Sequence, residues 1–289
     1  MFLQFLINGL ITGCIYSLAS ISFALVYYTT HIFHIALAVL YVLAAYVFWY
    51  LTVALGIPVF VSLLISLFFT SAVSFGIERY VYYPLHKAKS SLNVVMVSSI
   101  GVFIVVTNII AMIWSNETKT FSSDISKVFS AGNIIITARQ AMQFIGSTVL
   151  IILFFVALNF SRAGLRIKAV RDDAELFQVI GFSLTGIRRM SFLLSGFLIG
   201  AASCLTAMDI GMDPYVGMPI LLNAIVALII GGMGRFESCI IGGLSLGILQ
   251  ALVVWKWSAQ WQEAITFLIL IIFLFMRPQG LIGERSRLA

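Results

Sequence analysis

The sequence predicts an all-α protein, a polytopic transmembrane bundle of about nine helices. Of its 289 residues, 61% are hydrophobic and only 10% are charged, and the mean hydropathy is +1.09. Soluble domains carry about 25% charged residues. Residues 1–77 contain no Asp, Glu, Lys or Arg. A soluble fold has no need of such a stretch, whereas each helix that crosses a bilayer needs about 20 apolar residues in a row.

The predicted spans follow one another along the whole chain. The first run is long enough to hold two elements, so eight to ten spans are compatible with the pattern. We expect a single transmembrane domain over residues 1–289, because no Pro-rich or Ser-rich linker divides the chain. The spans are 3–27, 36–54, 57–77, 93–114, 139–160, 190–208, 217–233, 238–255 and 260–276.

The connections between these spans justify the divisions in order. The first three spans come from the uncharged stretch, and the fourth follows a basic connection with Lys87 and Lys89. A long connection, 115–138, precedes the fifth span, and we expect a short surface element there. Residues 161–189 form a charged connection before the sixth span. Pro and Gly residues punctuate the short seventh span, among them Pro219, Gly231 and Gly232.

Charge asymmetry predicts the orientation of the bundle. Nine spans place the two termini on opposite sides of the membrane. With the C-terminus inside, only Lys119, Lys127, Arg139 and Lys256 lie outside, which leaves 13 of the 17 basic residues inside. Cytoplasmic loops of membrane proteins carry an excess of Lys and Arg. We therefore expect a protein of the bacterial inner membrane with its N-terminus out and its C-terminus in.

The same rule explains the net charge of +6, so nucleic-acid binding is not expected. The sequence contains no phosphate-binding loop, no catalytic set and no Cys/His cluster with metal-ligand spacing. We expect no enzyme activity, no metal and no cofactor. Intramembrane acids of the kind that relay protons are nearly absent from the predicted spans.

Residues 161–190 are a polar island with nine charged side chains. Such a charged segment cannot lie in the hydrocarbon core, so we expect it to protrude into water, where it offers a contact surface for a cytoplasmic partner. We expect a short helix over residues 170–181. Acidic side chains load its first turn, which the helix dipole favours, and Phe177 at its middle is available to a partner or packs on the chain's own helices.

Neutral polar residues within the spans are candidates for a translocation pathway, although a buried amide in lipid commonly bonds a neighbouring helix instead. Asn223 is the strongest candidate because its span is short and punctuated by Pro and Gly residues. Helices that are broken at mid-membrane expose backbone groups that can bind a solute. Three GxxxG pairs, Gly9/Gly13, Gly196/Gly200 and Gly243/Gly247, predict close helix crossings. The candidate pathway residues are Asn8, Thr12, Asn108, Pro214, Gly217 and Asn223.

Four blocks in the second half resemble the permeases of branched-chain amino acid ABC importers, the LivH/LivM type. They are residues 164–181, Asp213-Pro214 with Gly217 and Asn223-Ala224, Gly231-Gly232-Met233-Gly234 with Gly242-Gly243, and residues 277–283. The order and spacing of the blocks carry the resemblance. The first half is similar to the family more loosely and departs from it at His34, Leu37, Ala38 and Ala44.

The resemblance implies a permease that is driven by ATP hydrolysis on another chain. Its partners would be cytoplasmic ATP-binding subunits, a second permease subunit in a heterodimer, an extracytoplasmic substrate-binding protein and membrane lipid. Urea or amide transport is an alternative, and so is a self-sufficient carrier or channel. The implied ATPase-coupling residues are Ala169, Arg171, Asp172, Asp173, Glu175, Phe177 and Gly181.

Overall fold

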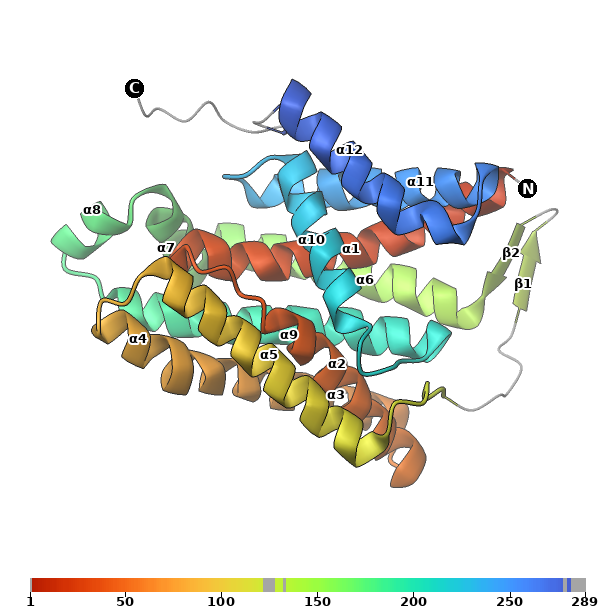
Figure 1. Cartoon of the computed structure of the whole chain (residues 1–289), viewed down its shortest axis with the longest axis horizontal. Coiled ribbons are helices and arrows are strands. Elements are labelled where there is room, and N and C mark those ends of the chain that lie inside the picture. The colour runs from red at the N-terminus through yellow and green to blue at the C-terminus, as the bar shows by residue number, and fades with distance from the viewer. Residues whose placement is uncertain (1, 122–127, 132–133, 278–279, 282–289) are drawn as a thin grey trace. The chain divides into compact units, whose positions relative to one another are not determined.

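The computed structural model describes residues 2–121, 128–131, 134–277 and 280–281, and these are almost entirely helical (Figure 1). The fold is the predicted all-α bundle. The helices are α1 (Phe2–Thr30), α2 (Leu37–Trp49), α3 (Val59–Ile77), α4 (Tyr83–Lys87), α5 (Leu92–Trp114), α6 (Ala138–Phe160), α7 (Arg162–Asp172), α8 (Ala174–Val179), α9 (Leu184–Ile210), α10 (Gly217–Gly231), α11 (Phe236–Lys256) and α12 (Gln262–Met276).

Within the described residues, eight helical runs are long and apolar enough to cross a membrane, and α10 is a shorter apolar helix of 15 residues. All nine predicted spans correspond to one of these elements. Turns of π-helix extend α2 to Ala54 and connect α3 through Glu78–Tyr82 to α4. A 3-10 turn, Ala259–Trp261, precedes α12.

Two predicted boundaries were wrong. Helix α9 begins at Leu184 rather than at residue 190, and the third span continues as helix to Lys87. Both extensions carry charged residues that the sequence pattern placed in connections. Because Arg188 and Glu78 pair with each other inside the protein, their charges do not end the helices there.

The described chain forms two compact units, and neither is a continuous stretch of sequence. Unit 1 takes its residues from the ranges 1–24, 124–148 and 219–289. Unit 2 takes its residues from the ranges 25–123 and 149–218.

Unit 2 is organised around α3, which packs against α2 and α9. Hydroxyl groups along α3 donate to carbonyl groups of the facing helices: Ser66 Oγ to Ala44 O and Ser74 Oγ to Phe192 O, each at 2.7 Å. Such bonds satisfy polar side chains within hydrocarbon. A Cβ atom on Gly196 would lie 2.6 Å from Ser74 Cβ, so this predicted close crossing is confirmed.

Unit 1 brings α1 and α11 together through the other two glycine pairs. A Cβ on Gly13 would lie 2.9 Å from Leu244 Cα, and a Cβ on Gly247 would collide with the backbone of Gly9. Both helices therefore pack backbone to backbone, as the GxxxG spacing predicted. The Ser17 hydroxyl donates to Ile240 O at 3.2 Å at the same crossing.

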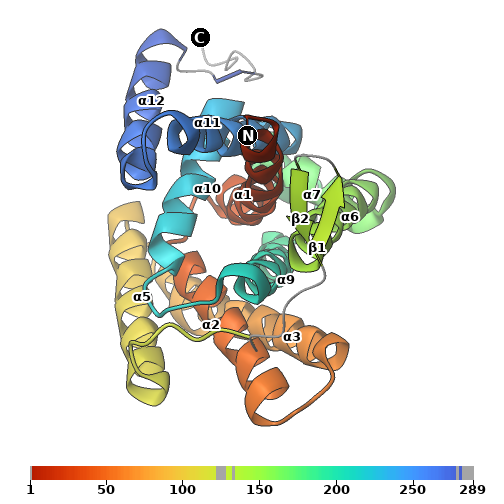
Figure 2. The same cartoon turned by 90° about the vertical axis from the view of Figure 1, so that its right-hand side faces the viewer.

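The predicted surface element in the long connection is a β-hairpin of unit 1, which Figure 2 shows facing the viewer. Strand β1 (Val128–Ala131) pairs antiparallel with β2 (Ile134–Thr137), with Val128 opposite Thr137. The Gln4 amide accepts from Ile135 N and donates to Ile135 O, both at 2.8 Å, and so fastens the hairpin to α1.

Candidate functional site

A pocket in unit 1 lies between α1, α11 and α12 and has a volume of about 170 Å³. This is below the usual range of about 300–1,000 Å³ for drug-sized ligands, so the pocket suits a small solute. The structure brings two of the predicted pathway residues, Asn8 and Thr12, into its wall. The lining residues are Phe5, Asn8, Gly9, Thr12, Gly247, Gln250, Ala251, Val254 and Gln262.

Gln250 anchors the polar side of this pocket and is 3% exposed. Its Oε1 accepts from Tyr16 Oη and from Gln262 Nε2, both at 2.8 Å. Its Nε2 donates to Asn223 Oδ1 at 3.0 Å and to Thr266 Oγ1 at 2.9 Å. Two donors and two acceptors are thereby used, which is the usual capacity of a side-chain amide. Gln250 and its four partners form a hydrogen-bonded hub that connects α1, α10, α11 and α12 at the pocket.

Asn223 does not line the pocket. It is 8% exposed and reaches the pocket wall only through its bond to Gln250. This matches the alternative that a buried amide bonds a neighbouring helix. Gln250 and Gln262 are pocket residues that the predicted pathway set omitted. Their signal was an amide within an apolar run for Gln250, and for Gln262 a position in the first turn of the last span.

The remaining predicted pathway residues lie in unit 2 and do not meet in one site. The exposed Asn108 side chain on α5 donates to Ile104 O of its own helix at 2.7 Å. Pro214 and Gly217 are buried where the chain enters α10. A Cβ on Gly217 would collide with Ala38 O, so glycine is required by the close approach of α2.

The polar island forms two helices rather than the one expected over residues 170–181. The break falls at Asp173, whose extended backbone lies between α7 and α8. Its side chain accepts from Glu175 N at 3.0 Å and Leu176 N at 2.8 Å, which caps α8. An N-cap aspartate satisfies amide groups that no helical carbonyl reaches, and this favours a new helix over a continued one.

Phe177 packs inside the protein rather than facing outward. Its side chain is 5% exposed and stacks on Phe182 with ring centroids 5.1 Å apart. The exposed apolar side chains of this segment are instead Leu176, Val179 and Ile180, at 55%, 83% and 64%. Figure 1 shows α4, α7 and α8 at the same end of unit 2.

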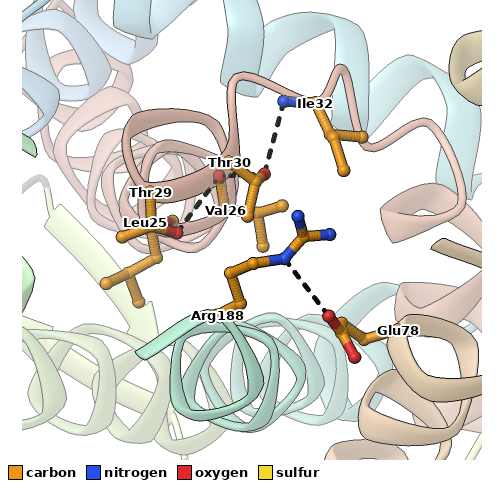
Figure 3. A network of polar contacts seen from close by, with 7 residues as sticks. All are labelled: Leu25, Val26, Thr29, Thr30, Ile32, Glu78 and Arg188. Carbon is orange, nitrogen blue, oxygen red and sulfur yellow. Dashed lines mark hydrogen bonds and ion pairs between the residues drawn. The ribbon is translucent and has the colours of Figure 1, made fainter. Parts of the chain in front are cut away.

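A buried ion pair that the sequence pattern did not predict lies behind this end of unit 2. Arg188 Nε of α9 donates to Glu78 Oε1 at 3.3 Å, and the two side chains are 6% and 0% exposed. Glu78 Oε2 and Arg188 Nη2 have no hydrogen-bond partner among the described residues. Figure 3 shows the terminal nitrogens of Arg188 pointing away from Glu78, toward Thr30 at the end of α1 and Ile32 in the connection that follows.

His34 lies in the connection between α1 and α2 and begins a chain of hydrogen bonds that leads through Tyr82 to α5. Its Nδ1 lies 2.8 Å from Tyr82 Oη, which donates to Ser99 Oγ at 2.7 Å. Ser99 Oγ also accepts from Ala36 N at 2.9 Å. Complete burial lowers the pKa of His34 to about 3, so its imidazole is neutral at physiological pH. Helix α1 ends just before this connection, at Thr30, and His31 has a φ of +54°.

Comparison with known families gives this geometry its context. The family described as branched-chain amino acid transport system / permease component matches residues 5–274. The chain belongs to this family. It is therefore a multi-pass membrane permease, the permease component of an ABC importer.

Relatives match the permease over nearly its whole length. LivH of Salmonella typhimurium, a high-affinity branched-chain amino acid transport permease protein, is 26% identical and aligns over 98% of this chain and 96% of its own. BraD of Pseudomonas aeruginosa is 25% identical with the same coverage. A probable LivH of Methanocaldococcus jannaschii is 24% identical over 92% of this chain and 88% of its own.

A solved structure supports the fold. PsaBC from Streptococcus pneumoniae, in complex with Fab, superposes with a TM-score of 0.53 and covers 96% of this chain and 93% of its own. The sequences are 13% identical.

Proposed function

We propose that the permease moves a branched-chain or similar aliphatic amino acid into the cytoplasm, and that the substrate passes the pocket between α1 and α11. The single observation that carries this proposal is the lining of the pocket. Hydroxyl and amide groups meet apolar side chains there, and among the described residues no Asp, Glu, Lys or Arg lines it.

This lining suits a small zwitterion. Asn8, Thr12 and Gln262 offer donors and acceptors for a carboxylate and an ammonium group, while Phe5 and Val254 offer apolar surface to an aliphatic side chain. A solute with net charge would lose its hydration and meet no counter-charge. The relatives named for branched-chain amino acid transport support the same substrate class.

The proposed partners divide between the two faces of the membrane. ATP-binding subunits dock on α8 through Leu176, Val179 and Ile180, whose apolar side chains are exposed. The neighbouring coupling residues set the charge and shape of that surface. They are Ala169, Arg171, Asp172, Asp173, Glu175 and Gly181. The buried Phe177 stacks on Phe182 and so fixes the position of α8. A second permease subunit completes a heterodimer, lipid surrounds it, and a binding protein delivers substrate from outside.

The proposed orientation in the inner membrane is N-terminus out and C-terminus in, which places α4, α7 and α8 in the cytoplasm. The distribution of basic residues supports it. Asp124 and Glu284, natural labelling sites in the outer loop and the C-terminal tail, lie outside the described residues. Ala88→Cys after α4 and Trp261→Cys before α12 are exposed alternatives. In a background without Cys14, Cys204 and Cys239, an impermeant thiol reagent should label Trp261→Cys in intact cells and leave Ala88→Cys unlabelled.

Uptake measurements test the substrate class. Labelled leucine, urea and a short peptide are offered to cells with the wild-type gene and to cells that lack it. Loss of leucine uptake in the cells that lack the gene supports the proposal. Loss of urea uptake alone would instead show that the permease transports urea or amides. Loss of peptide uptake with leucine and urea unaffected contradicts both assignments.

A further inference from the structure

Helix α4 and the connection between α8 and α9 enclose a crevice in unit 2 with a volume of about 610 Å³. One wall is His86 of α4, and the other begins at Gln178 of α8 and continues into the first residues of α9. Both walls expose polar groups, unlike the apolar pocket formed by α6, α7 and α9 in the same unit. The lining residues are His86, Gln178, Gly181, Phe182, Ser183, Leu184 and Thr185.

We infer that α4 is a second ATPase-contacting element of the permease, and that an acidic segment of the ATP-binding subunit lies against α4 and enters this crevice. The inference rests on the proposed function, in which α8 contacts the same subunit. It adds an element that lies about ninety residues earlier in the sequence than α8.

Side-chain contacts hold the two walls in fixed positions. The Arg189 guanidinium of α9 lies 5.7 Å from the ring centroid of Tyr83, the first residue of α4. The Arg188–Glu78 ion pair joins the same two parts of the chain one residue earlier in α9. On the other wall, Phe182 stacks on Phe177 and lies under the Arg166 guanidinium at 5.4 Å. The crevice is therefore built before a partner arrives.

Basic residues on and beside α4, next to His86 in the sequence rather than in the crevice lining, indicate the chemistry of the occupant. Between residues 79 and 91 the chain carries Arg79, His86, Lys87 and Lys89, and it carries no acidic residue. Within the described part of the chain, Arg79, Lys87 and Lys89 form no ion pair and are exposed. Acidic residues instead lie on the α8 side, at Asp173 and Glu175. A partner that spans both walls would therefore present acidic groups to α4 and basic groups to α8.

Site-specific photo-crosslinking tests the inference. A photoreactive amino acid is placed at His86, at Leu176 on α8 and at Trp261 before α12 as an exposed control, and the permease is co-expressed with its tagged ATP-binding subunit. We expect crosslinks to that subunit from His86 and Leu176 and none from Trp261. Crosslinks from Leu176 alone would overturn the inference and leave the proposed function intact. Crosslinks from neither position would overturn both this inference and the proposed docking of the ATP-binding subunit on α8.

Charge reversal provides the second measurement. The double variant Lys87→Glu/Lys89→Glu should reduce co-purification of the ATP-binding subunit about tenfold, with the permease still inserted and monodisperse. The matched control is Lys256→Glu at the end of α11, which should leave co-purification unchanged. If the double variant keeps its ATP-binding subunit but loses co-purifying phosphatidylglycerol, the basic wall contacts anionic lipid, and the inference is wrong.

Discussion

Arg188 of α9 and Glu78 of the turn that follows α3 form an ion pair that is sealed from solvent, with Nε and Oε1 3.3 Å apart. Burial of two charges is costly, and a single hydrogen bond at this length does not use all their donors and acceptors. Buried ion pairs of this kind contribute to a specific arrangement of helices more dependably than to stability. Here the pair joins α9 to the turn that leads into α4, close in sequence to the two walls of the crevice.

Removal of one charge should destabilise the permease strongly. Glu78→Leu leaves Arg188 buried without a counter-charge, at a cost of about 3–5 kcal/mol. The double variant Glu78→Leu/Arg188→Met should recover most of this loss, because neither charge remains. Thermal unfolding of the purified single and double variants in detergent measures the coupling. Equal destabilisation by the double and the single variants would show that the two residues do not act as a pair.

Replacement of a crossing glycine should separate α1 from α11. Gly247→Leu places side-chain atoms against the backbone of Gly9, which cannot yield as a flexible side chain can. We expect a loss of at least about 1–3 kcal/mol and a lower unfolding temperature. Gly101→Leu on α5 is the control, since no atom of the described residues lies within 4 Å of a Cβ there. A similar unfolding temperature for both variants would remove close packing as the reason for the GxxxG pairs.

Loss of the Gln250 amide should disrupt the pocket. Gln250→Leu leaves the buried groups of Tyr16, Asn223 and Thr266 without one hydrogen bond each, and an unsatisfied buried group costs about 1–3 kcal/mol. Gln250→Glu keeps the shape and the acceptors, but adds a charge. Transport by both variants should fall relative to wild type, and Gln250→Leu should also unfold at a lower temperature. Wild-type stability of Gln250→Leu would contradict the role of the hub.

The neutral state of His34 predicts a pH dependence of stability. The folded pKa, about 3, lies below the ordinary value of 6.5. Between pH 6.5 and 3 the unfolded chain therefore binds a proton at His34 that the folded chain does not bind. The free energy of unfolding falls as the pH drops through this range, by up to about 1.4 kcal/mol per pH unit. His34→Asn should flatten this part of the profile. Parallel profiles for wild type and His34→Asn would exclude His34 as the cause.

The sequence was sufficient for those parts of the structure that depend on local composition. Apolar run length predicted the nine spans, and the glycine spacing predicted that the helices carrying Gly13 and Gly247 approach a neighbouring helix closely. The sequence was insufficient where the local structure depends on a contact with a residue that is distant in the chain. Glu78 is the first charged residue after 77 uncharged ones, so the sequence pattern places the end of a span before it. In the structure the helix continues because Glu78 pairs with Arg188, which lies 110 residues later. The break at Asp173 likewise depends on a side chain that caps α8, and the burial of Phe177 depends on Phe182.

The α1–α11 pocket as the route of an aliphatic amino acid is tested most directly by ATP-dependent leucine uptake into proteoliposomes that contain the whole importer. Asn8→Leu removes a pocket amide, and Asn108→Leu removes an exposed amide on α5 as the matched control. We predict that Asn8→Leu lowers leucine uptake by about tenfold, the effect expected of one lost polar contact, while ATP hydrolysis continues and Asn108→Leu transports normally. Unchanged uptake by Asn8→Leu, or an equal loss in both variants, would contradict this route.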